Sequence, residues 1–394
     1  MPAMPRVIVM GGSLGGLTAA LVLRDAGCDV RVFERSSSAL QARGAGIAAL
    51  DATLRYLVER GGYRPEEVCS STGWIRFFNR DGSLRHEQRH HYWFSSWNTI
   101  YRSLLSLLDA ERYLLGHEVV AFGRDGDTVR VTLADGSQAG ADLLVCADGV
   151  SSTARAALIP GAAPSYAGYV AWRGTLPERA LSPATRKAFE EAINYQVLAG
   201  SHILVYPIPA LDGSLAEGDR LINMVWYVNV AAGHELDQLM SGKDGVRRAV
   251  SLPPGAATDE AVAGLRRAAE QALAAPIAEV VTSVAEPFVQ AVYDIDVPRM
   301  ALGRVCLIGD AAFAVRPHAA AGTAKAAADG WALAEELAAV GDVPAALAAW
   351  ERRQLLLGRR LLARTREIGD ASQFTGTFRP GDPRLIFGLH EPGN

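Results

Sequence analysis

The sequence predicts an α/β fold, with one domain of alternating strands and helices, an interleaved sheet-rich domain and a helical C-terminal region. Three observations predict it. An apolar, β-branched run over 6–10 precedes a glycine-rich turn, helical apolar spacing over 14–26 and a second strand over 30–33. Between about 165 and 291 long strands with polar faces predominate. From 323 to 372 the apolar spacing is mostly helical.

The glycine-rich turn over 9–18 reads VMGGSLGGLT. It is not a P-loop, because Leu17 stands where that motif needs its lysine. It fits the dinucleotide-binding motif G-x-G-x-x-G at Gly11 and Gly16. Ser13 replaces the second glycine, but it is small and its hydroxyl can donate to a phosphate oxygen. At a strand-to-helix turn, the free amides that begin the helix would face a pyrophosphate.

The second strand ends at Glu34, 23 residues beyond Gly11. In a Rossmann-like βαβ unit an acid at about this spacing binds the ribose hydroxyls of an adenosine. The alternative is an ordinary glycine-rich turn with a surface glutamate. The order of strand, turn, helix, strand and acid favours a Rossmann-like dinucleotide-binding domain.

The remaining predicted elements follow along the chain. Helices are expected over 51–60, 99–108 and 256–274. Strands are expected over 74–78, 83–87, 129–133, 142–146, 202–208, 220–230 and 304–308. The turn NRDG over 79–82 joins the first two of these strands as a hairpin.

Composition limits the classes of function. The 394 residues exceed one ordinary core, so two domains are expected. With 39 basic and 43 acidic residues and no polybasic run, the chain has no pattern for binding nucleic acid or a membrane surface. No apolar segment reaches the length of a membrane span and no signal peptide is recognised, so a cytoplasmic protein is expected. The four cysteines and eight histidines lack metal-binding spacing, so no metal site is expected.

Three motifs in order carry a resemblance to a known family. They are GGSLGG with Glu34, CADGVSSTAR over 146–155, and GDAA over 309–312 followed by Pro317. The ordered trio resembles the single-component class A FAD-dependent aromatic monooxygenases over nearly the whole chain. We therefore predict an FAD-binding domain and a substrate domain. The FAD-binding domain with its C-terminal helices takes 1–70, 98–164 and 292–372, the substrate domain takes 71–97 and 165–291, and the C-terminal tail is 373–394.

The resemblance implies which residues hold FAD. They are Gly11, Ser13, Leu14, Gly16, Glu34, Arg35, Arg43, Arg102, Asp148, Gly149, Asp310, Gly322, Thr323 and Ala324. Arg35 should lie against the adenine end, while Arg43 and Arg102 should reach the pyrophosphate or nearby cofactor oxygens, since guanidinium pairing suits phosphate. The alternative for Arg102 is an ordinary arginine on a helix surface.

The implied contacts continue toward the flavin. Asp148 and Gly149 would lie beneath the cofactor, although Asp148 could instead be a turn former. Asp310 should accept a hydrogen bond from the ribityl chain. The backbone of 322–324, at the start of a helix, should face the flavin pyrimidine oxygen and stabilise an anionic reduced flavin. Phe313 departs from the family, since many relatives carry histidine there, and it receives no role.

The family's chemistry implies NADH or NADPH and dioxygen as co-substrates. A nicotinamide reduces the flavin, dioxygen adds to give a flavin hydroperoxide, and its distal oxygen attacks an electron-rich ring. Only one glycine fingerprint is present, so the nicotinamide must bind without a fold of its own. The oligomeric state stays open between a monomer and a homodimer.

The substrate pocket is expected on the sheet of the second domain. Alternate strand positions share a face, which groups His202, Leu204 and Tyr206 on one strand and places Asn223 and Tyr227 together on another. We predict that His202 and Tyr206 orient and deprotonate a ring hydroxyl, that His318 does so from the flavin edge, and that Asn223 and Tyr227 bind substrate. The alternative is that these side chains are sheet packing or solvated strand residues.

The sequence lacks the motifs of two other enzyme classes. A short-chain dehydrogenase would need a Tyr-x-x-x-Lys pair and a flavin halogenase a WxWxIP stretch, and the chain has neither. A non-catalytic flavin- or ligand-binding protein stays open. The pocket residues include no arginine or lysine cluster, which favours a neutral or weakly acidic hydroxylated ring, first a dihydroxypyridine-like heterocycle and second a phenolic natural-product intermediate. Arg173 and Arg220 lie nearby in the sequence, and either could turn inward and bind a carboxylate.

Overall fold

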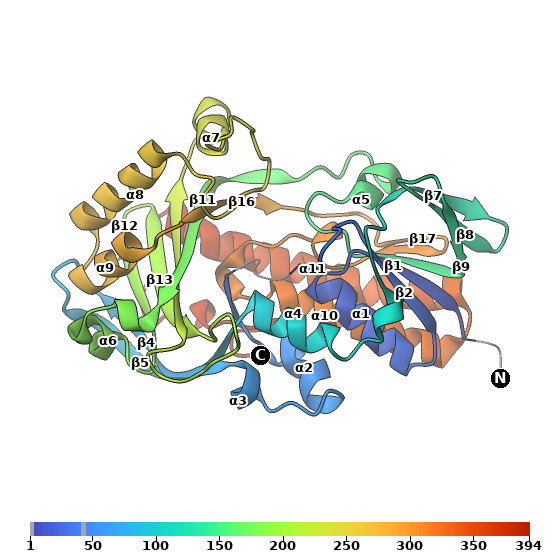
Figure 1. Cartoon of the computed structure of the whole chain (residues 1–394), viewed down its shortest axis with the longest axis horizontal. Coiled ribbons are helices and arrows are strands. Elements are labelled where there is room, and N and C mark those ends of the chain that lie inside the picture. The colour runs from blue at the N-terminus through green and yellow to red at the C-terminus, as the bar shows by residue number, and fades with distance from the viewer. Residues whose placement is uncertain (1–3, 41–44) are drawn as a thin grey trace.

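The computed structural model describes residues 4–40 and 45–394, and two large sheets form the two ends of an elongated molecule (Figure 1). The first sheet has six strands in the order β17-β18-β10-β1-β2-β6. Its strands are β1 (Arg6–Met10), β2 (Asp29–Glu34), β6 (Tyr113–Leu115), β10 (Leu143–Cys146), β17 (Ala301–Leu302) and β18 (Val305–Leu307).

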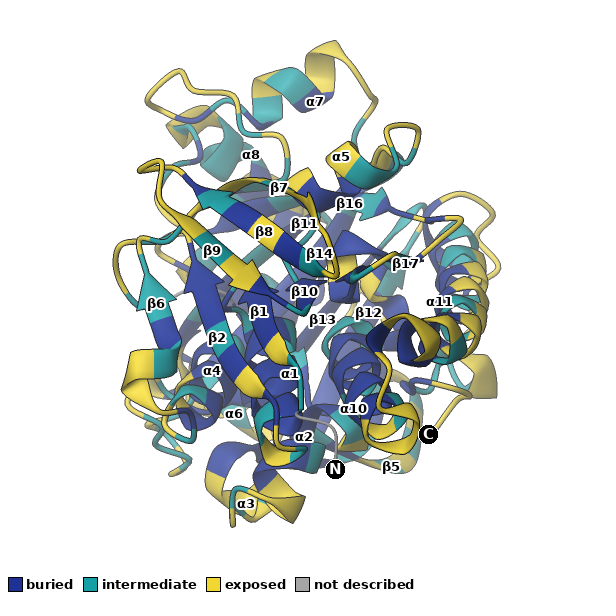
Figure 2. Cartoon of the chain, turned by 90° about the vertical axis from the view of Figure 1, so that its right-hand side faces the viewer, coloured by how far each residue is buried: buried dark blue, intermediate teal, exposed yellow. Residues whose placement is uncertain are grey.

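The centre of this sheet is parallel and buried. Strand β1 pairs in parallel with β2 and β10, and β10 pairs in parallel with β18. Val7, Ile8 and Val9 are at most 1% exposed, as expected for a parallel strand covered on both faces. Figure 2 views this domain end-on and shows the dark-blue centre of the sheet. The predicted Rossmann-like architecture is confirmed.

Helices and a small sheet cover the six-stranded sheet. Helix α1 (Leu14–Asp25) packs against α10 (Gly322–Val340) so closely that a Cβ on Gly330 would lie 2.9 Å from the Cα of Ala19. The short helices near this domain are α2 (Asp51–Glu59), α3 (Pro65–Val68), α4 (Trp97–Leu105) and α5 (Thr153–Leu158). The three-stranded sheet consists of β7 (Val119–Asp125), β8 (Thr128–Leu133) and β9 (Gln138–Ala141).

The second sheet has nine strands in the order β15-β16-β11-β14-β13-β12-β4-β5-β3. Its strands are β3 (Gly46–Ala48), β4 (Ser70–Phe78), β5 (Leu84–Ser96), β11 (Ser165–Pro177), β12 (Ala192–Leu198), β13 (Ser201–Ile208), β14 (Leu221–Asn229), β15 (Ser251–Leu252) and β16 (Phe288–Asp294). Helices α6 (Pro183–Phe189), α7 (His234–Leu239), α8 (Asp259–Ala272) and α9 (Ala275–Ser283) accompany it.

The two faces of the large sheet have different roles. Ile203, Val205 and Met224 point to one face, where they pack with residues of α8 and α9. Leu204 and Tyr227 point to the other face, toward the C-terminal helix and tail. The alternation predicted for β13 and β14 is confirmed, and it leaves the second face to form the wall of a cleft.

The long helix α11 (Val343–Gln373) connects the two domains (Figure 1). Near its start Glu351 pairs with Arg299, 2.9 Å away, beside the six-stranded sheet. At its end Ser372 hydrogen-bonds the imidazole of His202 on the large sheet. Since 31 residues of α-helix span about 46 Å, one helix sets the distance between both sheets.

Two segments refine the predicted organisation. Strand β3 pairs antiparallel with β5, so 46–48 extends the large sheet, although it falls within the segment predicted for the FAD-binding domain. The predicted tail, 373–394, packs on the same sheet, where Tyr92 accepts a hydrogen bond from the amide of Phe387. Over the residues that the structure describes, no helix combines the length and apolar character needed to span a bilayer.

Candidate active site

Two connected clefts lie where the domains meet. The outer cleft, about 260 Å³, lies at the carboxyl ends of β1 and β2. The inner cleft, about 400 Å³, is lined by both domains. Ser13, Trp97, Ala147 and Gly149 line both clefts. The two clefts therefore form one continuous site.

The glycine turn shapes the floor of the outer cleft. Gly11 has a φ of +103°, and a Cβ there would lie 2.5 Å from the carbonyl oxygen of Ala147. Ser13 is the N-cap of α1, but its side chain makes no capping hydrogen bond. Leu14 begins the helix and lines the inner cleft, while Gly16 packs against the Gly11 carbonyl. The first-turn amides of a 12-residue helix are therefore available to an anionic ligand.

Glu34 lies at the other side of the outer cleft and is 6% exposed. Its carboxylate accepts hydrogen bonds from the amides of Gly12 and Ser36, both at 2.9 Å. These contacts hold the carboxylate at the end of β2, and Arg35 lines the cleft beside it. The carboxylate keeps further acceptor sites for a ribose hydroxyl.

The motif over 146–155 forms the lower edge of the outer cleft. The carboxylate of Asp148 accepts from the hydroxyl of Ser152 at 2.6 Å and from the amide of Ala154 at 3.1 Å. It therefore organises its own loop, as in the turn-forming alternative, while lining the cleft. Arg155 is 3% exposed and donates to the carbonyl oxygens of Asp310 and Ala311. The second motif is thus tied to the third.

Asp310 and the start of α10 face the inner cleft. Asp310 is an exposed residue on the cleft wall, and Gly322 and Thr323 line the same wall. The N-cap residue of α10, Ala321, makes no side-chain capping hydrogen bond, so the first amides and positive dipole end of the helix are open to the cleft. Ala324 is fully buried and does not line the cleft.

A buried ion pair in α10 stabilises the backbone next to Asp310. Lys325 and Asp329, 2.6 Å apart and at most 1% exposed, lie one turn apart on α10. Asp329 also accepts from the amide of Gly309 at 2.8 Å. The pair therefore fixes the backbone that carries Asp310 into the cleft.

The large sheet supplies the opposite wall. Leu204, Tyr206, Val225 and Tyr227 line the inner cleft from β13 and β14. Burial raises the pKa of Tyr206 to about 12 and raises that of Tyr227 further, so both phenols are neutral O–H groups at physiological pH. Neither hydroxyl has a hydrogen-bond partner among the described residues. Both are therefore available to a ligand.

Arg173 turns into the inner cleft from β11. Its terminal nitrogens donate to Gln290 Oε1 and to the carbonyl oxygen of Gly46, both at 2.8 Å. Arg220, the other arginine considered from the sequence, pairs with Glu178 at 2.9 Å and does not line the cleft. One of the two arginines thus faces the site.

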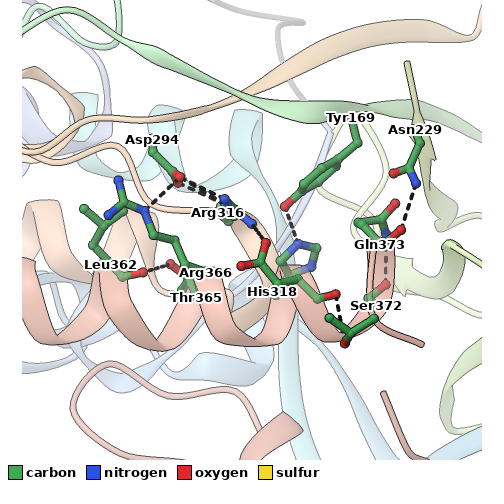
Figure 3. Close-up of polar contacts among 12 residues, drawn as sticks. Tyr169, Asn229, Asp294, Arg316, His318, Leu362, Thr365, Arg366, Ser372 and Gln373 are labelled. Atoms are coloured by element: carbon green, nitrogen blue, oxygen red, sulfur yellow. Dashed lines mark hydrogen bonds and ion pairs between the residues drawn. The ribbon is translucent and has the colours of Figure 1, made fainter. Parts of the chain in front are cut away.

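His202 and His318, which the sequence predicted to be catalytic, do not line the inner cleft. They line a neighbouring cavity of about 30 Å³, which Leu204 and Tyr227 also line. His202 is 2% exposed, and its Nδ1 is 2.5 Å from the hydroxyl of Ser372. His318 Nε2 is 2.7 Å from the Tyr169 hydroxyl, in the polar cluster at the end of α11 (Figure 3).

Both histidines are buried, and their pKa values are lowered. Burial lowers the pKa of His202 to about 3. Burial, with His202 and Arg316 nearby, also lowers the pKa of His318. Both imidazoles are neutral and are held by protein partners, so the structure does not bring them to the substrate position predicted from the sequence.

Three other predicted residues also lie elsewhere. Asn223 is fully buried and does not line the inner cleft, and its Oδ1 accepts a hydrogen bond from the amide of Gly46 at 2.8 Å. Arg102 donates to the carbonyl oxygen of Leu211 at 3.1 Å on the surface, which agrees with the helix-surface alternative. Arg43 lies outside the described residues.

Trp97 and Gln290 are among the lining residues that the sequence did not predict. Trp97, where the clefts join, stacks on Tyr101 with ring centroids 4.8 Å apart. Gln290 reaches the inner cleft from β16, beside Arg173. Trp97 had a weak signal as an aromatic residue at a predicted domain boundary. Nothing in the local sequence indicated Gln290, because its contact with Arg173 depends on the pairing of β16 with β11, which is distant in the chain.

Comparison with known proteins shows the family of the chain. A family model described as FAD binding domain matches residues 4–193 and 255–365. A second model, FAD binding domain-like, matches 166–294. The chain is 38% identical to 2,6-dihydroxypyridine 3-monooxygenase of Paenarthrobacter nicotinovorans, over 98% of this chain and 96% of the relative. The chain belongs to the FAD-dependent aromatic monooxygenases.

A second curated relative and a solved structure also match the chain. It is 30% identical to 3-amino-4-hydroxybenzoate 2-monooxygenase of Streptomyces cremeus, over 82% of this chain and 76% of the relative. The solved structure of 2,6-dihydroxypyridine-3-hydroxylase from Arthrobacter nicotinovorans superposes with a TM-score of 0.93 at 35% identity, covering 100% of this chain and 99% of that one. The resemblance to this hydroxylase, expected from Ser13 and from the stretches over 206–210 and 316–330, is confirmed.

The residues present fit FAD, the cofactor of this family. Gly11 leaves no room for a Cβ, the first turn of α1 offers free amides, and Glu34 stands at the end of β2. Together they make a cradle for a diphosphate and a ribose. The inner cleft continues from there past Asp310 to the start of α10, where the flavin end would be held. NADH or NADPH is the co-substrate of these enzymes.

Proposed function

We propose that this chain hydroxylates a small hydroxylated nitrogen heterocycle of the dihydroxypyridine class, with NADH and dioxygen. The observation that carries this proposal is the inner cleft, where Asp310 and α10 on one wall face Tyr206, Tyr227 and Arg173 on the other. The 38% identity to a dihydroxypyridine monooxygenase supports the substrate class. The need for reduced nicotinamide favours a cytoplasmic setting.

FAD bound in the continuous cleft supplies electron transfer from the nicotinamide and activation of dioxygen for transfer to the ring. Residues of the chain would bind each part of the cofactor. The amides at the start of α1 would bind the pyrophosphate, Glu34 the ribose and Asp310 the ribityl hydroxyls. The amides at the start of α10 would stabilise negative charge on the pyrimidine edge of the flavin.

The large sheet would bind and orient the substrate. Leu204 and Val225 provide an apolar surface for the ring plane and help exclude water. The hydroxyls of Tyr206 and Tyr227 supply hydrogen bonds at its edge. Because His202 and His318 lie behind this wall, we infer that they maintain its shape and that Tyr206 and Tyr227 contact the substrate.

A second substrate class is favoured by one observation. Arg173 faces the cleft, and a guanidinium pairs well with a carboxylate. A hydroxybenzoate carries a carboxylate in addition to its activating hydroxyl. The relative from Streptomyces cremeus is named for a substrate of this kind.

The test uses purified protein reconstituted with excess FAD. NADH oxidation is followed with 2,6-dihydroxypyridine, a hydroxybenzoate and a simple phenol, and products are examined for one added oxygen atom by mass spectrometry. We expect 2,6-dihydroxypyridine to give the fastest coupled turnover. Preferred hydroxylation of the hydroxybenzoate would refute the heterocycle assignment. Retention of FAD with no hydroxylated product from any ring would refute a catalytic function.

A further inference from the structure

Arg173 carries a charge that the protein does not balance. Its two hydrogen-bond acceptors, Gln290 Oε1 and the Gly46 carbonyl, are neutral. It makes no ion pair with any carboxylate in residues 4–40 or 45–394. The remaining internal segment, 41–44, reads QARG and contains no carboxylate. A partly buried guanidinium without a counter-charge is unfavourable, so a negatively charged ligand would stabilise it.

Asp310 is the other charged residue among the described residues lining the inner cleft, and it belongs to the opposite wall. Although Asp310 is open to the cleft, the protein around it limits its hydration and so raises its pKa, and the cations that oppose this rise are Lys325 and Arg155. Both cations belong to the FAD-binding domain, on the wall opposite Arg173. The positive charge of Arg173 remains available to a ligand on the sheet side.

The groups around Arg173 also favour an oxygen anion. Its positive charge lowers the pKa of Tyr206 and Tyr227, opposing the larger effect of burial, so it lies near both phenols. These are the titratable groups that face it from β13 and β14. From β3 and β16 it meets Gly46 and Gln290, which do not titrate. Gln290 turns its oxygen to Arg173, which leaves its amide N–H groups as donors.

We propose that Arg173, flanked by Tyr206 and Tyr227, binds an ionised ring oxygen and so selects the monoanion of a hydroxylated heterocycle as substrate. This inference rests on the proposed function. Each terminal nitrogen of Arg173 donates one N–H to a protein acceptor, so its second N–H remains to donate to an anionic oxygen. The substrate loses its hydroxyl proton to solvent before binding. Its ring is then more electron-rich, as electrophilic oxygen transfer requires.

The experiment compares Arg173→Gln and Arg173→Lys in the FAD-loaded protein. The matched control is Arg179→Gln, which breaks an exposed ion pair with Asp219 on the same domain. Binding of 2,6-dihydroxypyridine is followed by the change in flavin absorbance across a pH series, and KM and kcat are measured separately. Binding to the wild type and the control should tighten as the free ligand ionises. Arg173→Gln should raise KM at least about tenfold and lose that pH dependence, and Arg173→Lys should restore part of both.

Three results would overturn the proposal. The first is Arg173→Gln with unchanged affinity for 2,6-dihydroxypyridine but lost affinity for nicotinate, which would make Arg173 a carboxylate site. The second is altered flavin absorbance or FAD retention in Arg173→Gln without ligand, which would assign the guanidinium to the cofactor. The third is wild-type binding that weakens as the ligand ionises. Failure of turnover alone would count against the proposed function, because ligand binding is measured independently of it.

Discussion

Substitution of Gly11 by alanine tests the cofactor cradle most directly. At a φ of +103° an L-residue is strained by about 1–2 kcal/mol. The added Cβ would also lie 2.5 Å from the carbonyl oxygen and 2.9 Å from the carbonyl carbon of Ala147, both backbone atoms that cannot rotate away. The segment over 147–149 must therefore shift, and this segment lines both clefts.

The expected result for Gly11→Ala is a loss of stability beyond the backbone strain alone and a rise of at least about tenfold in the FAD dissociation constant. Gly82→Ala is the control, because Gly82 has a φ of +85° with no atom within 4 Å of an added Cβ. It should show the strain alone and bind FAD normally. Urea unfolding gives the stability, and flavin fluorescence titration gives the affinity. Equal stability of the two variants, with wild-type FAD affinity in Gly11→Ala, would refute the reasoning.

Three further predictions concern the cofactor, the reaction and the fold. Glu34→Ala or Asp310→Ala should lower the FAD that remains bound after gel filtration, measured by absorbance, and full retention in both would contradict their assignment. NADH oxidation by the wild type should be slow alone and rise sharply with a correct substrate, and equally fast stopped-flow reduction without that substrate would count against coupling. Burial lowers the pKa of His202 from 6.5 to about 3, so between these values the unfolded chain binds a proton that the native chain excludes. The contribution of His202 to stability should therefore fall as the pH falls below about 6.5, approaching about 1.4 kcal/mol per pH unit. His202→Gln should reduce that slope in urea unfolding between about pH 7 and 5, whereas a change at exposed His234 should not.

The first βαβ unit shows how much the local sequence can predict. The apolar run of β1, the glycines at 11 and 16, the helical spacing of α1 and Glu34 are all close together in the chain, and each follows a local physical rule. The face shared by Leu204 and Tyr206 likewise follows from the two-residue period of a strand. These features were predicted because their causes lie within a few residues.

Other features depend on which distant segments meet. The two-residue period correctly placed His202 on the same face as Tyr206, but it could not show that α11 brings Ser372 over that end of the strand and closes it from the inner cleft. Asn223 was predicted to face substrate, yet the chain at Gly46 occupies its amide oxygen.

The sequence by itself determined the Rossmann-like unit, the family of the chain and the cofactor, because short-range spacing and ordered motifs specify them. The tertiary structure decided which side chains line the inner cleft. Arg173 and Arg220 were equivalent from the sequence, since both lie in or beside predicted sheet. Glu178 neutralises Arg220 outside the cleft, whereas Arg173 finds only neutral acceptors and remains charged on the cleft wall. Charge compensation depends on neighbours far along the chain, and only the packed sheet brings those neighbours together.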